Sequence, residues 1–132
     1  MPRFYDLDDA NARLAELRPL LEELKGNRDA VARAQAEMIR FSQTDGDPRH
    51  AAGLQERQEQ IRELVRRMRE TVLRIDGWDI TLRDIEAGLV DFPALANGRP
   101  IWLCWRLGED DIGWWHEQNV GFEGRRPLLE LS

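Results

Sequence analysis

The sequence predicts an α+β domain in which a long antiparallel helical hairpin, coiled-coil-like in its spacing, packs on a small three-stranded antiparallel sheet. Apolar residues recur at intervals of four and three through the first half of the chain, which is the spacing of a helix seam. The pair Asn97-Gly98 lies between two apolar runs and is a strong signal for a two-residue hairpin turn. Four of the five tryptophans fall within residues 89–117, around that turn.

The length of 132 residues suits a single domain, with a helical part over 1–77 and a tryptophan-rich part over 78–132. A charged fraction of 33% and a hydrophobic fraction of 42% are typical of a soluble, helix-rich chain. No apolar run is long enough to span a membrane, and residues 1–9 lack the apolar core of a signal peptide. A single cysteine excludes an internal disulfide, so we expect a bacterial or similar cytoplasmic setting. The net charge of −6 argues against nucleic-acid binding.

The first helix is expected to begin after Asp6, whose carboxylate suits an N-cap. Pro19 lies inside the periodic pattern and removes the hydrogen bond to the carbonyl of Ala15, so the helix should kink or divide there. Its apolar seam consists of Ala10, Leu14, Leu17, Leu21, Leu24, Val31 and Met38.

A polar turn over residues 42–47 is expected to precede the second helix, because Asp47 and Pro48 suit its N-cap and first position. Gly77 suits the position just after its end. The seam of this helix consists of Leu54, Gln58, Ile61, Leu64, Val65, Met68, Val72 and Ile75.

The two predicted helices are longer than the sheet that should cover them. A helix of about thirty residues is roughly 45 Å long, whereas a strand of five to seven residues spans about 17–24 Å. Part of the hairpin should therefore stay uncovered by the sheet. A four-helix bundle made from two hairpins covers it, so we expect a homodimer, the alternative being that each helix only covers the other.

A two-residue turn at Asn97-Gly98 sets the register of the first two strands. It directs the apolar residues of both strands toward the helices and places Asp91 opposite Cys104 on the other face. Pro93 donates no backbone hydrogen bond, so its strand should lie at an edge or a bulge there. The other expected pairs are Ala94–Ile101, Phe92–Leu103, Val90–Trp105, Leu89–Arg106 and Pro93–Trp102.

A second turn, centred on Glu109 and Asp110, should lead into a third strand at residues 114–117. A slip of one residue would invert the faces of that strand. The expected pairs are Trp105–Trp114, Leu103–His116, Cys104–Trp115 and Trp102–Glu117. The apolar face then consists of Val90, Phe92, Ala94, Ile101, Leu103, Trp105, Leu107, Ile112 and Trp114.

Two segments flank this predicted sheet. Residues 78–88 should form a short strand or turn with Ile80 and Leu82 in the core. Residues 121–127 should form an extended tail across the sheet, anchored by Phe122.

Several segments carry a resemblance to a known family: GLVDFPA at 88–94, LCWRLGE at 103–109, WHE at 115–117 and GFEGRRP at 121–127. With LRPLLEEL at 17–24, they resemble the signature of an uncharacterised prokaryotic family, the domain of unknown function twenty-two oh three, over nearly the whole chain. The C-terminal motifs are specific, whereas the helical one is generic. The resemblance implies no established activity.

The second face of the predicted sheet is the candidate binding site. Asp91, Arg106 and Glu117 should lie on neighbouring strands there, beside the indoles of Trp102 and Trp115. The functional interpretation is a site for a peptide or a small anionic ligand, with Arg106 supplying positive charge. The alternative is a cross-strand ion-pair network worth about 0–1 kcal/mol per exposed pair.

Metal binding and thiol catalysis are weighed on the same face. Asp91, Cys104 and Glu117 form a possible set of three ligands, but their spacing matches no zinc pattern and we expect no metal. In the predicted register His116 points away from Cys104, which argues against a Cys–His nucleophile. The sequence identifies no cofactor.

Arg125 and Arg126 are the last candidates for ligand binding. With the backbone amides of residues 121–124 they could cradle a phosphate, although the segment is no dinucleotide or Walker fingerprint. The alternative is a docked tail whose arginines pair with acidic side chains.

The sequence therefore predicts a dimeric interaction, scaffold or ligand-binding module. It would self-associate through the helical hairpin and hold its partner on the second face of the predicted sheet, which carries the tryptophan, arginine and carboxylate side chains. No nucleic-acid or membrane partner is expected. The alternative is a small-ligand or metal-dependent enzyme with its site on the same face. A concave pocket there would favour an enzyme, and a flat or tail-covered face would favour a scaffold.

Overall fold

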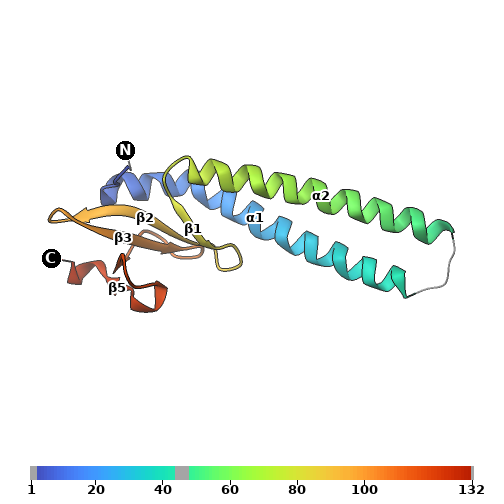
Figure 1. The fold of residues 1–132 in the computed structure, drawn as a ribbon. Coiled ribbons are helices and arrows are strands. Elements are labelled where there is room, and N and C mark those ends of the chain that lie inside the picture. Colours follow the sequence, from blue (N-terminus) through green and yellow to red (C-terminus); the bar gives the residue numbers. More distant parts are fainter. Residues whose placement is uncertain (1–2, 44–47, 132) are drawn as a thin grey trace.

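The computed structural model describes residues 3–43 and 48–131 of the chain and consists of two helices and one antiparallel sheet (Figure 1). Helix α1 spans Leu7–Ser42 and helix α2 spans Pro48–Asp76; they lie side by side and run in opposite directions. The α+β class predicted from the sequence is confirmed. Most of the predicted interhelical turn, including the Asp47 cap, lies outside the described residues. No helix in the described ranges combines the length and apolar character of a bilayer span.

Helix α1 begins as expected but is not divided. The Asp6 carboxylate accepts a hydrogen bond of 2.7 Å from the backbone amide of Asp9, which confirms the N-cap. The helix continues through Pro19, so the predicted division is wrong. Pro19 is exposed, while Leu17 and Leu21 on either side of it are fully buried. Packing of these leucines offsets the loss of one backbone hydrogen bond.

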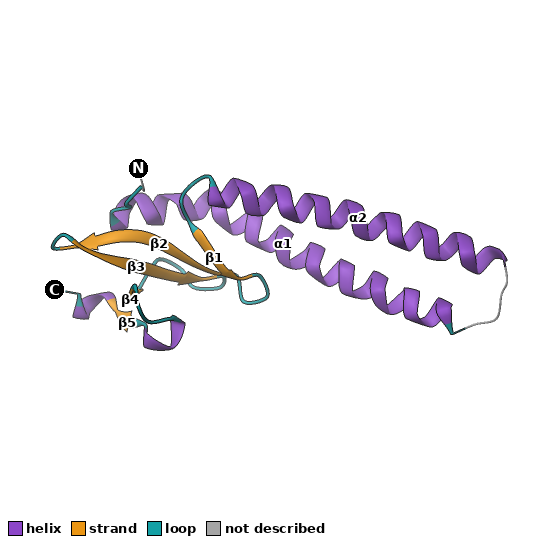
Figure 2. Ribbon diagram, in the orientation of Figure 1, coloured by secondary structure: helices purple, strands orange, loops and turns teal. Residues whose placement is uncertain are grey.

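The sheet contains five strands in the order β1-β2-β3-β4-β5, not the three expected (Figure 2). The additional strands are short and form its two edges. The first joins the sheet because residue 82 pairs with residue 90, and the last because residue 127 pairs with residue 114. The predicted extended tail is thus partly an edge strand. The strands are β1 Thr81–Asp84, β2 Leu89–Ala96, β3 Arg99–Arg106, β4 Trp114–Glu117 and β5 Arg126–Pro127.

The β2–β3 hairpin has the register predicted from its turn. Asn97 and Gly98 both adopt positive φ, at 53° and 80°, as a type I′ turn requires. All six predicted pairs are present, including Asp91 opposite Cys104. The pairing of β1 with β2 stops at Asp91, so Pro93 lies beyond β1, where no strand needs a backbone N–H from it on that side. Its carbonyl there accepts a hydrogen bond of 2.7 Å from the backbone amide of Tyr5.

The register of β4 differs by one residue from the prediction. Cys104 pairs with Trp114, and Trp102 pairs with His116. The connection is a longer loop, because the backbone amide of Arg106 donates to the Glu109 carboxylate at 2.7 Å and residue 112 inserts its side chain into the core. A shift of one residue inverts every side chain of a strand.

Compared with the predicted register, the two tryptophans of β4 lie on exchanged faces of the sheet. Trp115, at 2% exposure, lies in the core with the apolar residues of β2 and β3, whereas Trp114 lies half-buried on the other face. The core is therefore a layer between α1 and one face of the sheet. It includes Leu14, Leu17, Leu21, Leu24, Val90, Phe92, Ile101, Leu103, Trp105 and Trp115.

Candidate functional site

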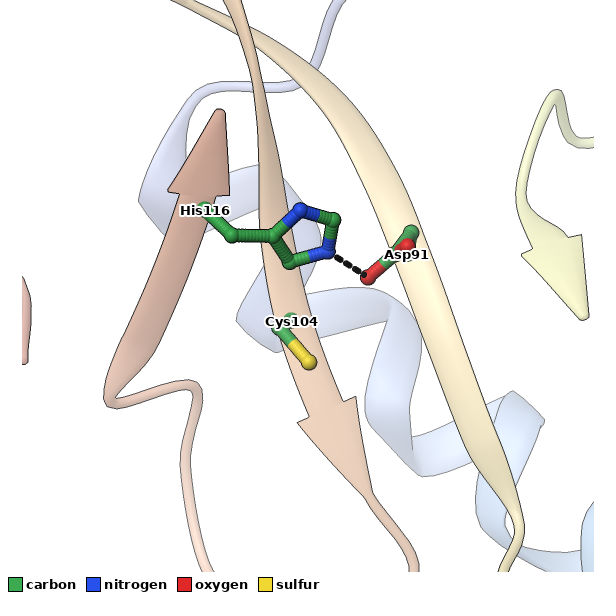
Figure 3. A group of neighbouring side chains, drawn as sticks. All are labelled: Asp91, Cys104 and His116. Atoms are coloured by element: carbon green, nitrogen blue, oxygen red, sulfur yellow. Dashed lines mark hydrogen bonds and ion pairs between the residues drawn. The ribbon is translucent and has the colours of Figure 1, made fainter. Parts of the chain in front are cut away.

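Three buried side chains that can ligate a metal meet on the face of the sheet opposite the core. Asp91, Cys104 and His116 come from the adjacent strands β2, β3 and β4 (Figure 3). One carboxylate oxygen, one imidazole nitrogen and the thiol sulfur all lie within 4.8 Å of one another. Alternation along each strand places them on one face, and the shifted register of β4 is what brings in the histidine.

The Asp91 carboxylate is only 2% exposed and has a different partner at each oxygen. Oδ2 accepts a hydrogen bond of 2.8 Å from Nε of Arg83. Oδ1 lies 3.0 Å from Nε2 of His116. A carboxylate removed from water needs such partners, because burial of an uncompensated charge is costly.

Arg83 reaches this carboxylate from an irregular point of the sheet. The pairing of β1 with β2 shifts between residues 82 and 84, so Arg83 occupies a β-bulge. Bulges re-aim side chains, and here the guanidinium turns toward Asp91 and lies 5.0 Å from the ring centroid of Trp102. Only Nε of this arginine forms a hydrogen bond within the described part of the chain.

The His116 ring faces an oxygen atom at each nitrogen. Nδ1 lies 2.9 Å from the backbone carbonyl oxygen of Glu117, which can only accept, so Nδ1 carries a proton. In the neutral ring Nε2 then presents a lone pair to the Asp91 carboxylate 3.0 Å away. Attraction between these two atoms requires a cation there, which is either a shared proton or a metal ion.

The thiol of Cys104 is fully buried beside the same carboxylate. Burial, and secondly the negative charge of Asp91, raise its pKa to about 12, although Arg125 acts in the opposite direction. His116 and Cys104 share a face after all, contrary to the predicted register. A thiol with a pKa this high is not an activated nucleophile at neutral pH, so proximity alone does not support thiol catalysis.

A pocket of about 280 Å³ opens above the buried pair of Asp91 and His116. Its lining includes Arg83 together with Gln118 and Asn119 from the loop that follows β4. The face is therefore concave at this point and holds charged, polar and apolar groups together. The remaining lining residues are Leu89, Val120, Gly121 and Phe122.

The structure places Arg106 on the predicted face but outside the pocket. Its side chain is exposed, and its guanidinium lies 5.9 Å from the ring centroid of Phe122. The prediction that Arg106 supplies the positive charge beside Asp91 is wrong, because Arg83 and His116 contact its two carboxylate oxygens. Trp102 is half-buried on the same face, under the guanidinium of Arg83.

Trp115 and Glu117 lie on the opposite face from Asp91, so their predicted place beside it is wrong. Trp115 is a core residue, and the Glu117 carboxylate forms an ion pair of 3.1 Å with Arg99. The exposed Arg126 lies over the ring of Trp115, at 5.6 Å from its centroid. None of these side chains lines the pocket.

Arg125 is engaged within the protein. Two hydrogen bonds of 3.0 and 2.9 Å join one of its terminal nitrogens to the Glu109 carboxylate. Its guanidinium also lies 4.5 Å from the ring centroid of Trp114 and 4.7 Å from that of Phe122. These contacts hold the loop before β4 to the segment after β4. They cover one end of the outer face, which is the face of the sheet opposite the core.

Sequence reasoning missed His116 and Arg83 as members of the site. His116 was assigned to the wrong face by the one-residue shift. Arg83 had a detectable signal, because Ile80 and Leu82 were expected in the core and alternation directs residue 83 to the outer face with Asp91.

Comparison with known proteins supports the resemblance seen in the sequence. Residues 3–128 match the model of the family described as "Uncharacterized conserved protein (DUF2203)". No curated protein and no solved structure matches the chain. The family description names no activity, so the geometry of the pocket carries the functional argument.

Proposed function

We propose that this chain, which belongs to the uncharacterised conserved family DUF2203, is a ligand-binding protein whose outer-face pocket holds a small anion. One observation carries the proposal: Arg83 lines the pocket while only its Nε is hydrogen-bonded within the described ranges. Its two terminal nitrogens are therefore available to a ligand.

The charge and shape of this guanidinium favour a carboxylate or a phosphate. Arginine presents a planar fork of donors that matches both groups in a bidentate arrangement. The Nε contact to Asp91 and the Trp102 ring hold the fork in place, so a ligand gains its hydrogen bonds with little further loss of side-chain entropy. Gln118 and Asn119, which also line the pocket, offer further polar groups to the ligand.

The size of the pocket limits the ligand. About 280 Å³ lies just below the range of roughly 300–1,000 Å³ found for small-molecule sites. The pocket thus fits a compact anion better than a nucleotide or a folded partner. A peptide would fit through a single acidic side chain or its terminal carboxylate.

The test is a titration of inorganic phosphate and of succinate, followed by backbone amide chemical shifts. Saturable shifts are expected for residues 83 and 118–121, and Arg83→Gln should abolish them. Arg106→Gln is the matched control, because Arg106 is an exposed arginine on the same face outside the pocket. Shifts that are absent, or that respond equally to both variants, would refute the proposal.

We also propose that α1 and α2 self-associate through the end distant from the sheet. Figure 1 shows both helices extending beyond the sheet, and Ala34 is the one buried residue of α1 after Leu24 in the described chain. Ile39 and Val65, which lie on these helices away from the end of α2 that joins the sheet, are exposed, at 59% and 38%. A second copy of the chain would cover such apolar side chains and form a four-helix arrangement.

Light scattering at micromolar concentration tests this proposal, with a dimer mass as the expected result. Ile39→Glu should shift the mass toward the monomer. Leu129→Glu is the control, since Leu129 is fully exposed but lies far along the chain, in the C-terminal segment. A monomer mass for the unmodified protein would refute self-association.

A further inference from the structure

The geometry points to a transition-metal site of the zinc class formed by Asp91, Cys104 and His116, of which Asp91 and His116 line the pocket. We expected no metal from the sequence because the ligand spacing matches no zinc pattern, and the predicted register turned His116 away from Cys104. The observed register of β4 instead puts His116 on the same face as Asp91 and Cys104. This site goes beyond the proposed anion binding and does not depend on it.

The distances suit a metal centre. Metal bonds of about 2.0–2.3 Å in a tetrahedral site hold ligand atoms roughly 3.3–3.8 Å apart. The donor atoms of Asp91, Cys104 and His116 lie within 4.8 Å of one another, and the nitrogen and the carboxylate oxygen are 3.0 Å apart. Figure 3 shows the three side chains side by side on adjacent strands, so the proposal requires them to move together by up to about 1 Å.

The histidine is already oriented as a metal ligand. Metal-bound histidines donate their second ring N–H to a carbonyl or carboxylate, which fixes the tautomer and the direction of the lone pair. Nδ1 of His116 donates to the Glu117 carbonyl, so in the neutral ring the lone pair of Nε2 points at the Asp91 carboxylate. The histidine is 2% exposed, and a bound metal ion would replace the proton that Nε2 and Oδ1 otherwise share and would bond to both atoms.

The surroundings complete the site. Arg83 binds Oδ2 of Asp91 and leaves Oδ1 for the ion, as outer partners of ligating carboxylates do. Asp91 and His116 line the pocket, so we expect the fourth coordination position to face it and to take water or a ligand. Three protein ligands with one open position are the arrangement of catalytic, rather than structural, zinc sites.

The donor set selects the class of metal. One sulfur, one nitrogen and one oxygen suit Zn²⁺, Co²⁺ or Fe²⁺ and do not suit Mg²⁺ or Ca²⁺, which take oxygen ligands. A thiolate and a carboxylate together balance the two charges of such an ion. The thiol proton of Cys104 leaves to solvent when the sulfur binds.

The experiment uses the full chain without a histidine tag, first stripped with a chelator and then titrated with Co²⁺ and Zn²⁺. We expect one ion per chain, a near-ultraviolet charge-transfer band from a cobalt–thiolate bond, and intense visible bands from tetrahedral Co²⁺. Addition of Zn²⁺ should remove both sets of bands. The charge-transfer band tests the sulfur ligand in the unmodified protein, even if a cysteine variant does not fold.

Isosteric variants test the other ligands. Asp91→Asn, Cys104→Ser and His116→Gln should each weaken Zn²⁺ binding by at least about tenfold. Glu117→Gln is the matched control, because this acid lies next to His116 in the chain but on the other face, paired with Arg99. Far-ultraviolet circular dichroism confirms that each variant is folded.

Two results would overturn the metal site: a folded protein that binds neither ion stoichiometrically, or bound Co²⁺ without a thiolate band. Equal losses of affinity in Glu117→Gln and His116→Gln would also overturn it. Phosphate titration of the metal-free protein is separate, so a failure of anion binding does not affect this outcome.

Discussion

The exchange of Trp114 and Trp115 between the two faces of the sheet can be tested by replacing each with alanine. Trp115 is 2% exposed in the core, whereas Trp114 is half-buried against the guanidinium of Arg125. A buried tryptophan removes about 150–250 Å² from water, and its truncation to alanine typically costs about 3–5 kcal/mol. We expect Trp115→Ala to cost about 4 kcal/mol and Trp114→Ala about 2 kcal/mol.

The measurement is chemical unfolding followed by far-ultraviolet circular dichroism, which does not depend on the tryptophan removed. For a chain of this length a difference of about 2 kcal/mol corresponds to roughly 8 °C in Tm. A larger loss in Trp114→Ala than in Trp115→Ala would refute the observed register and restore the one expected from a two-residue turn.

A milder substitution separates packing from hydrogen bonding at the same position. The indole Nε1 of Trp115 is buried and has no hydrogen-bond partner in the part of the chain that the structure describes. Trp115→Phe removes this unpaired donor together with part of the ring, so it should cost only about 1 kcal/mol. A cost equal to that of Trp115→Ala would mean that the N–H group is bonded.

Three further outcomes are expected. Gly88→Ala should destabilise the fold by more than Gly98→Ala, although φ is positive at both positions. An added Cβ at residue 88 would lie 2.5 Å from Cβ of Leu107, whereas no atom lies within 4 Å of one added at residue 98. Thermal unfolding of the two variants measures the difference. Asp6→Ala should cost about 1 kcal/mol by loss of the N-cap, measured by urea unfolding. Cys104 has a raised pKa in the folded state, so the folded protein favours the protonated thiol. The resulting contribution to the unfolding free energy is fully present below pH 9 and is lost as the pH rises to about 12. Cys104→Ala should make the unfolding free energy decline less steeply over this pH range.

Much of the fold could be predicted because its signals are local. Asn97 and Gly98 tolerate positive φ, and a two-residue turn leaves one register for the strands on either side. The same reasoning correctly placed Asp91 opposite Cys104. The N-cap at Asp6 was equally predictable, since it depends on one side chain and the next backbone amides.

The third predicted strand shows where local reasoning stops. Several acidic and glycine residues lie between Leu107 and Trp114, and their composition does not fix the length of the turn. The Asn11 side chain accepts from the backbone amide of Ile112 at 2.8 Å, across 101 residues of sequence. Such long-range contacts select the register, and with it the face on which His116 lies.

The sequence by itself determined the α+β class, the buried leucines of the first helix and the register of the central hairpin, because each depends on residues close together in the chain. The predicted seam of the second helix was only partly correct, since Gln58 and Val65 are exposed. Only the tertiary structure decided that His116 joins Asp91 and Cys104, that Arg83 supplies the charge beside them, and that two edge strands complete the sheet. The physical reason is that side chains alternate between the two faces along each regular strand. Which face a given residue takes in the next strand depends instead on the register, and the register depends on how the whole core packs.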